Sequence, residues 1–347
     1  MKVLVLSTMV PFVRGGAEEH CDHLVINLRR HGGVDAEVMR IPFTWHPAER
    51  LVEEMLIARS LAVANADLVI PMKFPAYLVP HPNKVLWLLH QYRQAYDLWD
   101  SGQSNIPDTP RGREIRDMIR HADGIAFAEA RKIYTIGPVS AARVWRYNGF
   151  PAEPLPHPLN DPELFSGGEQ QGYVLAGGRV NAGKRQRLLV RALRYAPAVR
   201  LVIAGPPDRP EDAEDLRRAA AEEGVGDRLT LDLRFLPRAE LARLVNHALA
   251  VAYLPFDEDS VGYVTMEAFH AGKPVLSVSD AGGVLEIVRN EETGYVCAPD
   301  PEALGGELAA VAANPRRASI LGANGRRALQ ARGATWPAAV EKLLSCA

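Results

Sequence analysis

The chain has 347 residues, a length that suits two α/β domains better than one. Apolar residues make up 47% and charged residues 24%, as in ordinary globular proteins, and a formal net charge of −2 gives no basic excess for a nucleic-acid partner. Cys21, Cys297 and Cys346 are too few and too far apart for a disulfide framework, which favours a reduced, cytoplasmic setting.

The first half of the chain alternates short apolar runs with helical patterns, as βαβ units do. The expected strands lie at residues 2–7, 36–41, 67–71, 84–90 and 132–136, and the expected helices at residues 17–30, 47–64, 111–129 and 138–147. The first run, MKVLVLSTMVPF, lacks the long apolar region and cleavage site of a signal peptide and predicts a buried strand. No run reaches the ~18 apolar residues of a membrane span, so at most peripheral contact with the inner membrane surface is expected.

A Pro- and Gly-rich segment, residues 148–171, is predicted to link two domains. The alternation then resumes, with strands expected at residues 173–177, 199–205, 228–233, 249–255, 274–278 and 294–298. The pattern predicts an N-terminal Rossmann-like domain at 1–160, a C-terminal one at 171–330, and a helix within 331–347 that returns to the N-terminal domain. The fold class is therefore α/β, with two parallel sheets facing across a cleft and ligands outside the carboxyl ends of the strands.

Two strand-to-helix loops have the composition of anion sites. The first, VRGGAEEH, has paired glycines, Gly15 and Gly16, that let the backbone approach a ligand at a helix N-terminus; a plain tight turn is the alternative. The second, GRVNAGK, has the G-x4-G-K spacing of a nucleotide triphosphatase loop, but Arg185 follows it where that motif needs a hydroxyl for magnesium. Arg179 and Lys184 are better explained as two cations on a diphosphate, or else as solvated surface charges.

The most specific segment is DSVGYVTMEAFHAGKPVLS, which begins at Asp259. A glycine-containing loop leads into a short helix near Val264, so Asp259 and Glu267 can face one cleft, and a carboxylate is a natural acceptor for a vicinal diol. Backbone N–H groups at Gly262, Tyr263 and Val264 would add an anion site. The alternative has no ligand: Asp259 is then a solvated acid and Glu267 a glutamate near the start of a helix.

These motifs resemble the retaining, family-four type of glycosyltransferase with GT-B architecture. Further segments that share the resemblance are the NGF turn at Asn148, LVIAG at Leu201, the AGGVLEIV turn at Ala281, ETGYVCAPDPEAL at Glu292 and ATW at Ala334. The resemblance covers nearly the whole chain. Its most specific parts are the pair of acids eight residues apart and the Arg-x4-Lys loop. The first acid is Asp259 rather than the usual Glu, so its reach is one methylene shorter.

The resemblance implies a role for each motif residue. Gly15 and Gly16 contribute backbone to the donor, Arg179 and Lys184 bind the diphosphate, and Glu267 holds the ribose. Gly262, Tyr263 and Val264 supply the helix start. Asp259 and His90 face the transferred sugar, although a core histidine is the alternative for His90. The implied reaction is metal-independent hexosyl transfer from a nucleoside diphosphate sugar, with no cofactor, to a glycan or glycolipid acceptor in surface glycan synthesis.

Other readings stay open at this point. A sugar-nucleotide epimerase of the same fold, or a catalytically silent nucleotide-binding protein, would share the nucleotide grip. His20, Cys21 and His23 could form a metal site. The aromatic residues Trp87, Tyr92, Tyr96 and Trp99 are expected mostly in the core, but those from Tyr92 to Trp99 could border an acceptor pocket. His270, on the helix of Glu267, is expected to cap or pack.

Overall fold

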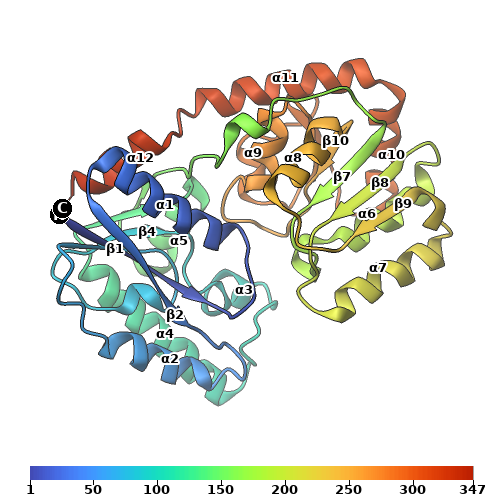
Figure 1. The fold of residues 1–347 in the computed structure, drawn as a ribbon. Helices are drawn as coiled ribbons and strands as arrows, with labels where there is room; N and C mark the ends of the chain where they lie inside the picture. The colour runs from blue at the N-terminus through green and yellow to red at the C-terminus, as the bar shows by residue number, and fades with distance from the viewer. Residues whose placement is uncertain (347) are drawn as a thin grey trace. The chain divides into compact units, whose positions relative to one another are not determined.

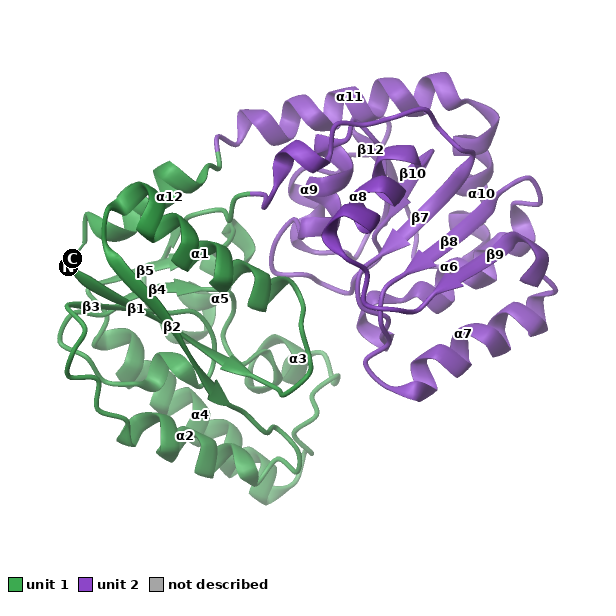
Figure 2. Ribbon diagram, in the orientation of Figure 1, with its two compact units in different colours: residues 1–158, 334–347 green, residues 159–333 purple. Residues whose placement is uncertain are grey.

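The computed structural model describes residues 1–346, which divide into two compact units. The first unit contains Met1–Pro158 together with the C-terminal segment from Ala334, and the second contains Leu159–Gly333 (Figure 2). The first boundary, between Pro158 and Leu159, falls inside the Pro- and Gly-rich segment. That segment is not structureless, because it contains the short strand β6 (Glu153–Pro154) and the 3-10 turn η3 (Pro162–Leu164).

The first unit is built on parallel strands, whose bounds are β1 (Lys2–Met9), β2 (Asp35–Pro42), β3 (Leu68–Pro71), β4 (Val85–Leu88), β5 (Lys132–Thr135) and β6. They pair in the orders β2-β1-β3 and β4-β5-β6. Isolated parallel bridges, Val69–Lys84 and Lys73–His90, join β3 to β4. Strands β3 and β4 are buried along their whole length, which is why they read as continuous apolar runs.

Helices cover both faces of this sheet: α1 (Gly16–Gly32) and α12 (Trp336–Leu344) on one, and α2 (Arg50–Ser60) and α4 (Pro110–Ala128) on the other (Figure 1). Along β1, Val3 and Val5 enter the core under α1, whereas Leu6 enters the opposite core. The unit also contains α3 (Asp97–Asp100), α5 (Pro138–Asn148), η1 (Ala76–Leu78) and η2 (Arg93–Ala95).

One predicted helix is shorter than expected. The pattern at residues 47–64 predicted a continuous helix, but α2 ends at Ser60 because Leu61 has an extended backbone. Leu61 and Val63 both pack against the core, as alternate residues of an extended segment do.

The second unit has one six-stranded parallel sheet. Its strands are β7 (Tyr173–Gly177), β8 (Arg200–Ala204), β9 (Leu229–Asp232), β10 (Ala250–Ala252), β11 (Val275–Val278) and β12 (Gly294–Cys297). The spatial order is β9-β8-β7-β10-β11-β12, which is the dinucleotide-binding order 3-2-1-4-5-6. In such a sheet the order in which successive strands are added reverses between the first and fourth strands, here β7 and β10.

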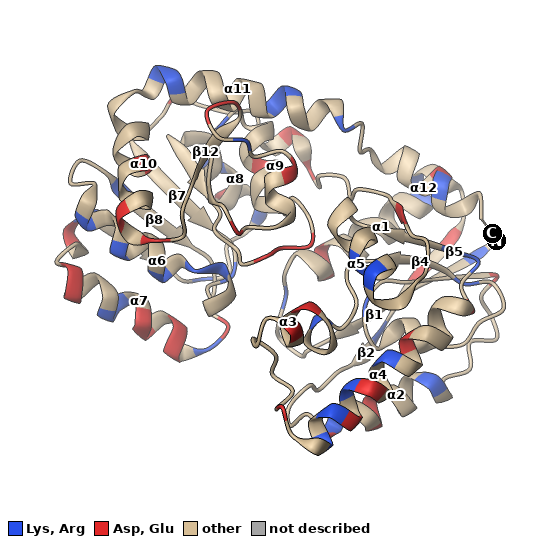
Figure 3. Cartoon of the chain, turned by 180° about the vertical axis from the view of Figure 1, so that it is seen from behind, with Lys and Arg blue, Asp and Glu red and all other residues tan. Residues whose placement is uncertain are grey.

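The helices of this unit are α6 (Gln186–Ala192), α7 (Pro210–Glu223), α8 (Arg238–His247), α9 (Tyr263–His270), α10 (Pro301–Ala313) and α11 (Pro315–Ala331). The 3-10 turns are η4 (Ala182–Lys184), η5 (Leu193–Tyr195), η6 (Gly226–Arg228) and η7 (Gly283–Glu286). Acidic and basic residues are interspersed along α7 (Figure 3). Within residues 1–346, no helix is long and apolar enough to cross a membrane.

Candidate active site

The loops after β7 and β10 are adjacent in the second unit because these two strands pair with each other. The loop after β7 contains the predicted cations Arg179 and Lys184. The loop after β10 runs from Tyr253 to Gly262 and contains the predicted acid Asp259. Ligands of doubly wound sheets bind where two neighbouring loops diverge in this way. The sheet order therefore brings together two motifs that lie about 80 residues apart in the sequence.

The loop after β7 has a constrained backbone. Gly178 has a φ of 101°, and a Cβ on Gly205 would lie 2.2 Å from the carbonyl oxygen of Gly178. The Asn181 side chain accepts a hydrogen bond from the backbone N–H of Lys184 at 2.9 Å and so caps η4. Asp208 orients the other side of the loop, because it accepts from Arg179 at 3.1 Å and from the Asn181 amide at 2.9 Å.

Arg185 has a structural role in this loop. Its φ is 56°, and its guanidinium donates to both oxygens of Asp280 and to the carbonyls of Leu254 and Pro255, at 2.7 to 2.9 Å. The side chain therefore ties the loop after β7 to those after β10 and β11. At the position where a triphosphatase loop holds magnesium through a hydroxyl, this chain has a cation that is committed to an ion pair.

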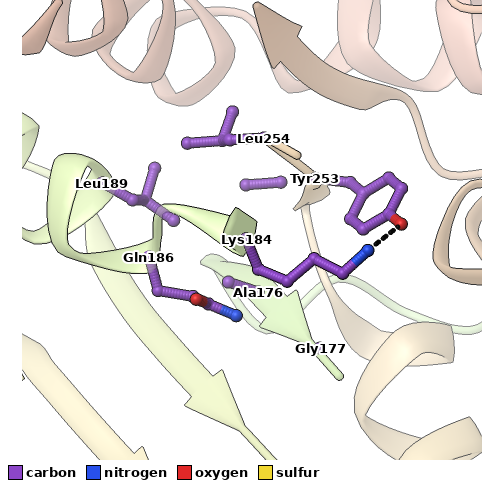
Figure 4. Close-up of a pocket in the computed structure, with 8 residues that line it drawn as sticks. Ala176, Gly177, Lys184, Gln186, Leu189, Tyr253 and Leu254 are labelled. Atoms are coloured by element: carbon purple, nitrogen blue, oxygen red, sulfur yellow. Dashed lines mark hydrogen bonds between the residues drawn. The ribbon is translucent and has the colours of Figure 1, made fainter. Parts of the chain in front are cut away.

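Lys184 is held by two groups that the sequence analysis did not single out. Its Nζ donates to the Tyr253 hydroxyl at 2.9 Å (Figure 4). The same Nζ also donates to the Glu258 carboxylate. Tyr253 Oη in turn donates to Glu258 at 2.9 Å. Burial lowers the pKa of Lys184, but the Tyr253 and Glu258 oxygens raise it by more, so the pKa of Lys184 lies above its ordinary value. The ammonium group is thus firmly charged.

Two neighbouring acids in the loop after β10 differ in exposure. The Glu258 side chain is 24% exposed, whereas Asp259, the predicted sugar-facing acid, is 4% exposed. The structure therefore places Glu258, not Asp259, on the predicted diphosphate-binding lysine. The run of three acids in DEDSVGY was the signal available in the sequence, and the spacing to Glu267 selected the third of them, Asp259.

The loop enters α9 through Gly262, Tyr263 and Val264. Gly262 has a φ of 73°, and a Cβ there would lie 2.7 Å from Cε1 of Tyr253. Glycine thus lets the start of α9 approach the ring that contacts Lys184. The N-terminus of α9 and the Lys184 ammonium group consequently both lie beside the Tyr253 side chain.

Glu267 lies on α9 and is only 3% exposed. Its carboxylate accepts from Arg238, the first residue of α8, whose guanidinium also donates to the carbonyl of Asn160 at 3.0 Å and lies 4.7 Å from the Phe165 ring centroid. Arg238 was not anticipated, because LPRAEL reads only as the start of a helix. His270, on the same helix, packs as expected, with Nδ1 3.1 Å from the Phe165 carbonyl oxygen.

The candidates of the first unit gather at the carboxyl ends of β1, β3 and β4. Gly15 is the N-cap of α1, and its N–H donates to Glu18 at 2.9 Å. Glu18 also pairs with Lys73 at 2.8 Å, and Lys73 forms the bridge to His90. His90 Nδ1 lies 2.6 Å from the Gln91 carbonyl oxygen, which can only accept, so Nδ1 has the proton. Gly16, Lys73 and His90 therefore share one edge of this sheet.

The alternative metal residues lie in an aromatic cluster instead. His20 is 2% exposed, stacks on Trp336 of α12 with ring centroids 5.5 Å apart, and meets the edge of Trp87 at 4.5 Å. Cys21 is fully buried. Trp87 is a fully buried core residue, as expected; of the aromatic residues proposed for an acceptor pocket, Tyr96 is also fully buried and Tyr92 is 8% exposed. Within residues 1–346, no three His, Cys, Asp or Glu side chains are grouped so as to hold a metal ion.

Residues 165–328, nearly all of the second unit, match the family model of the glycosyl transferases group 1. The second unit is therefore similar to the group 1 glycosyl transferases. A relative, the D-inositol 3-phosphate glycosyltransferase of Mycobacterium marinum, is 31% identical over 183 residues, which are 48% of this chain and 36% of that protein. The chain thus spans little more than a third of the length of such relatives. The alpha-maltose-1-phosphate synthase of Mycolicibacterium smegmatis is 26% identical over 358 residues, 91% of each chain.

Several solved structures share the fold of this chain. A sucrose-phosphate synthase from Thermosynechococcus elongatus matches 99% of this chain and 98% of its own, with a TM-score of 0.79 and 18% identity. HepE of Anabaena, solved with UDP-glucose, matches 99% and 98% with a TM-score of 0.71 and 17% identity. The predicted family and the predicted GT-B fold class, α/β with parallel sheets in two units, are confirmed.

Proposed function

We propose that the protein is a retaining glycosyltransferase that moves a hexosyl unit from a nucleoside diphosphate sugar to an acceptor hydroxyl. The single observation that carries this proposal is the placement of Lys184 at the point where the loops after β7 and β10 diverge, beside the N-terminus of α9. A cation and a helix N-terminus at such a point form a diphosphate site. The family match of this unit supports the same chemistry.

Each residue has a proposed task in the reaction. The glycosidic bond breaks toward an oxocarbenium-like transition state, so the largest requirement is to stabilise the charge that develops on the leaving diphosphate. Arg179, Lys184 and the start of α9 would supply that stabilisation without a metal. Glu267 would accept hydrogen bonds from the ribose hydroxyls. The departing phosphate would take the acceptor proton, so the mechanism needs no protein base.

The donor and acceptor are proposed as classes. The UDP-glucose complex of the Anabaena protein makes uridine diphosphate sugars the first donors to test. The acceptor class, a glycan or glycolipid in surface glycan synthesis, comes from the family resemblance, and the proposed site of action is cytoplasmic, at most peripheral to the inner membrane surface. Transfer to free small molecules, with no activity on any glycan or lipid-linked acceptor, would contradict that class.

Incubation with a panel of nucleotide-sugars tests the function itself. We expect release of nucleoside diphosphate, with the anomeric configuration of the product retained as measured by NMR. Conversion of the donor into a second nucleotide-sugar without diphosphate release would identify an epimerase instead. Binding of nucleotides without turnover of any donor, across a broad set of acceptors, would identify a silent nucleotide-binding protein.

A further inference from the structure

Lys184 already has an anionic partner of its own chain. Glu258 and Lys184 form an ion pair in which both side chains are about one-quarter exposed, so solvent reaches the pair and a ligand can too. Tyr253 donates to the same carboxylate and accepts from the same ammonium group. The lysine that is proposed to bind the donor diphosphate is therefore occupied by a carboxylate of the protein.

The backbone that presents Glu258 is fixed. Its N–H donates to the Ala281 carbonyl at 3.1 Å, and its carbonyl accepts from Gly283 at 2.7 Å. Gly282 lies so close that a Cβ there would be 2.5 Å from both the nitrogen and the oxygen of Glu258, and its φ of 65° also favours glycine. Because the main chain is held in this way, the side chain of Glu258 is the part of the residue that can adjust.

A diphosphate and the Glu258 carboxylate make opposing demands on one ammonium group. If the carboxylate keeps its place, two anions share Lys184 and repel each other; if it turns away, the ion pair is lost. Either outcome weakens diphosphate binding relative to a site with a neutral side chain at residue 258. The same pair also orients Lys184 in the empty site, so that the ammonium group is in position when a donor arrives.

We propose that Glu258 is a positioning residue that competes with the donor diphosphate for Lys184, and thereby favours release of the nucleoside diphosphate product. This inference rests on the proposed function. It predicts that Glu258 lowers the affinity of the enzyme for its product and keeps Lys184 oriented before the donor binds. Glu258→Gln keeps the size and the hydrogen-bonding capacity of the side chain but removes its charge. The variant should therefore bind the product more tightly.

Calorimetry with UDP, GDP and ADP on the full chain tests the inference. For the diphosphate that the wild type binds, we expect Glu258→Gln to lower Kd by about 5- to 150-fold, the usual range for two linked binding events. Product inhibition of turnover should become stronger by a similar factor. Damage to the fold would weaken binding, so tightening is a result that a merely structural role for Glu258 cannot give.

Two further variants make the test specific. The control variant Glu223→Gln removes a carboxylate that is 13% exposed and pairs with Arg194 at 3.0 Å. Glu223 is the last residue of α7, which leads back toward the start of β9 and away from the site. The diphosphate affinity of this variant should equal that of the wild type. In a Lys184→Met background, Glu258→Gln should tighten binding much less, because the shared partner is gone and only the direct repulsion between the two anions remains.

The outcomes separate the two proposals. If the wild type binds none of the diphosphates, both the proposed function and this inference are wrong. If the wild type binds one of them and Glu258→Gln binds it equally or more weakly, only the inference is overturned. A gain of the same size in the Lys184→Met background would also overturn it, because the competition would then not act through Lys184.

Discussion

Arg238 and Glu267 show how this unit accommodates a buried charge. Glu267 is 3% exposed, and an isolated carboxylate at that depth would be costly. Arg238 contributes an ion pair to Glu267 and donates to the Asn160 carbonyl, and it lies 3.7 Å from Asp161. The pair therefore joins the start of α8 to α9 and to the segment that opens the second unit. A proposed ribose-binding acid is in this way also part of the architecture.

The first prediction concerns this pair. Arg238→Met should lower the free energy of unfolding of the second unit by about 2–3 kcal/mol, because it leaves the Glu267 carboxylate buried without its cation; the partial exposure of Arg238 reduces the larger cost of a fully buried pair. Urea unfolding followed by far-UV circular dichroism measures it. The double variant Arg238→Met/Glu267→Gln should recover most of the loss, and a single variant as stable as the wild type would contradict the argument.

Gly262 supplies the second prediction, with Gly224 as a matched control. Both have a positive φ, 73° and 65°, but a Cβ on Gly224 meets nothing within 4 Å, whereas one on Gly262 meets the Tyr253 ring. Gly224→Ala should therefore cost only the ~1–2 kcal/mol of a left-handed alanine and leave diphosphate binding unchanged. Gly262→Ala should also displace Tyr253 and weaken diphosphate binding by about tenfold or more. Equal affinities in the two variants would show that the ring does not matter.

At the scale of elements, α12 packs on α1 through aromatic rings. Trp336 stacks on His20 and, at 6.4 Å between centroids, on His23. Burial, with contributions from His157 and His23, holds the pKa of His20 well below its usual value. The imidazole is therefore neutral in the folded protein, whereas the same ring in the unfolded chain takes up a proton near pH 6.5.

The third prediction follows from the sign of this shift. Above pH ~6.5 His20 is neutral in both the folded and the unfolded state, and its contribution to the free energy of unfolding is fully present. As the pH falls below that value, the unfolded chain binds the proton first. Stability is then lost until the pH reaches the pKa of His20 in the folded protein. Between pH 7.5 and 5.5 the loss from this residue should be on the order of 1 kcal/mol. In His20→Gln this part of the pH dependence should disappear.

Tryptophan fluorescence makes the measurement selective. All five tryptophans, Trp45, Trp87, Trp99, Trp145 and Trp336, lie in the first unit, so urea unfolding followed by this signal reports that unit alone. If the wild type and His20→Gln lose stability in parallel as the pH falls, the shift at His20 is not the cause.

At the scale of the molecule, the two units contribute different candidate residues. Arg179, Lys184, Glu258 and Glu267 belong to the second unit, whereas Gly16 and His90 belong to the first. We expect the second unit to hold the part of the donor that leaves as diphosphate, and His90 to act mainly on the transferred sugar.

The fourth prediction tests this division. Arg179→Ala or Glu267→Ala should weaken nucleoside diphosphate binding by about 10- to 150-fold, the value of a hydrogen bond to a charged group. His90→Ala and Asp259→Ala should leave that affinity nearly intact and sharply reduce turnover. Calorimetry with the product, alongside turnover, separates the two effects. Loss of product binding in His90→Ala would show that the division is wrong.

The fifth prediction is that turnover survives a chelator. With Arg179, Lys184 and the start of α9 on the diphosphate, a metal ion is not required to stabilise the leaving group. Asp257 and Asp259 are spaced as carboxylates that can share a divalent cation, which makes the test a real one. Activity lost in EDTA and restored by manganese or magnesium would replace this mechanism with a metal-assisted one.

Local sequence determined the elements of this protein. The apolar runs became the parallel strands, of which β3, β4, β10 and β11 are buried along their whole length, and the glycine-containing loops lie where a strand must turn into a helix. The burial of Glu267 could also be inferred from the sequence, because its neighbours in the chain, Met266, Ala268 and Phe269, are apolar. A resemblance carried by the loop GRVNAGK and the block from Asp259 added the family, since both motifs are contiguous.

The partners of the site residues were decided only by tertiary structure. Lys184 and Glu258 are 74 residues apart, and Arg238 and Glu267 are 29 apart; strand order, not local pattern, places them together. For the same reason the role of Arg185, which stands where a triphosphatase loop has its magnesium ligand, is an ion pair with Asp280, 95 residues away. His20 packs on an aromatic ring because α12 lies against α1. A sequence states which charges exist, whereas the sheet order decides which of them neutralise each other.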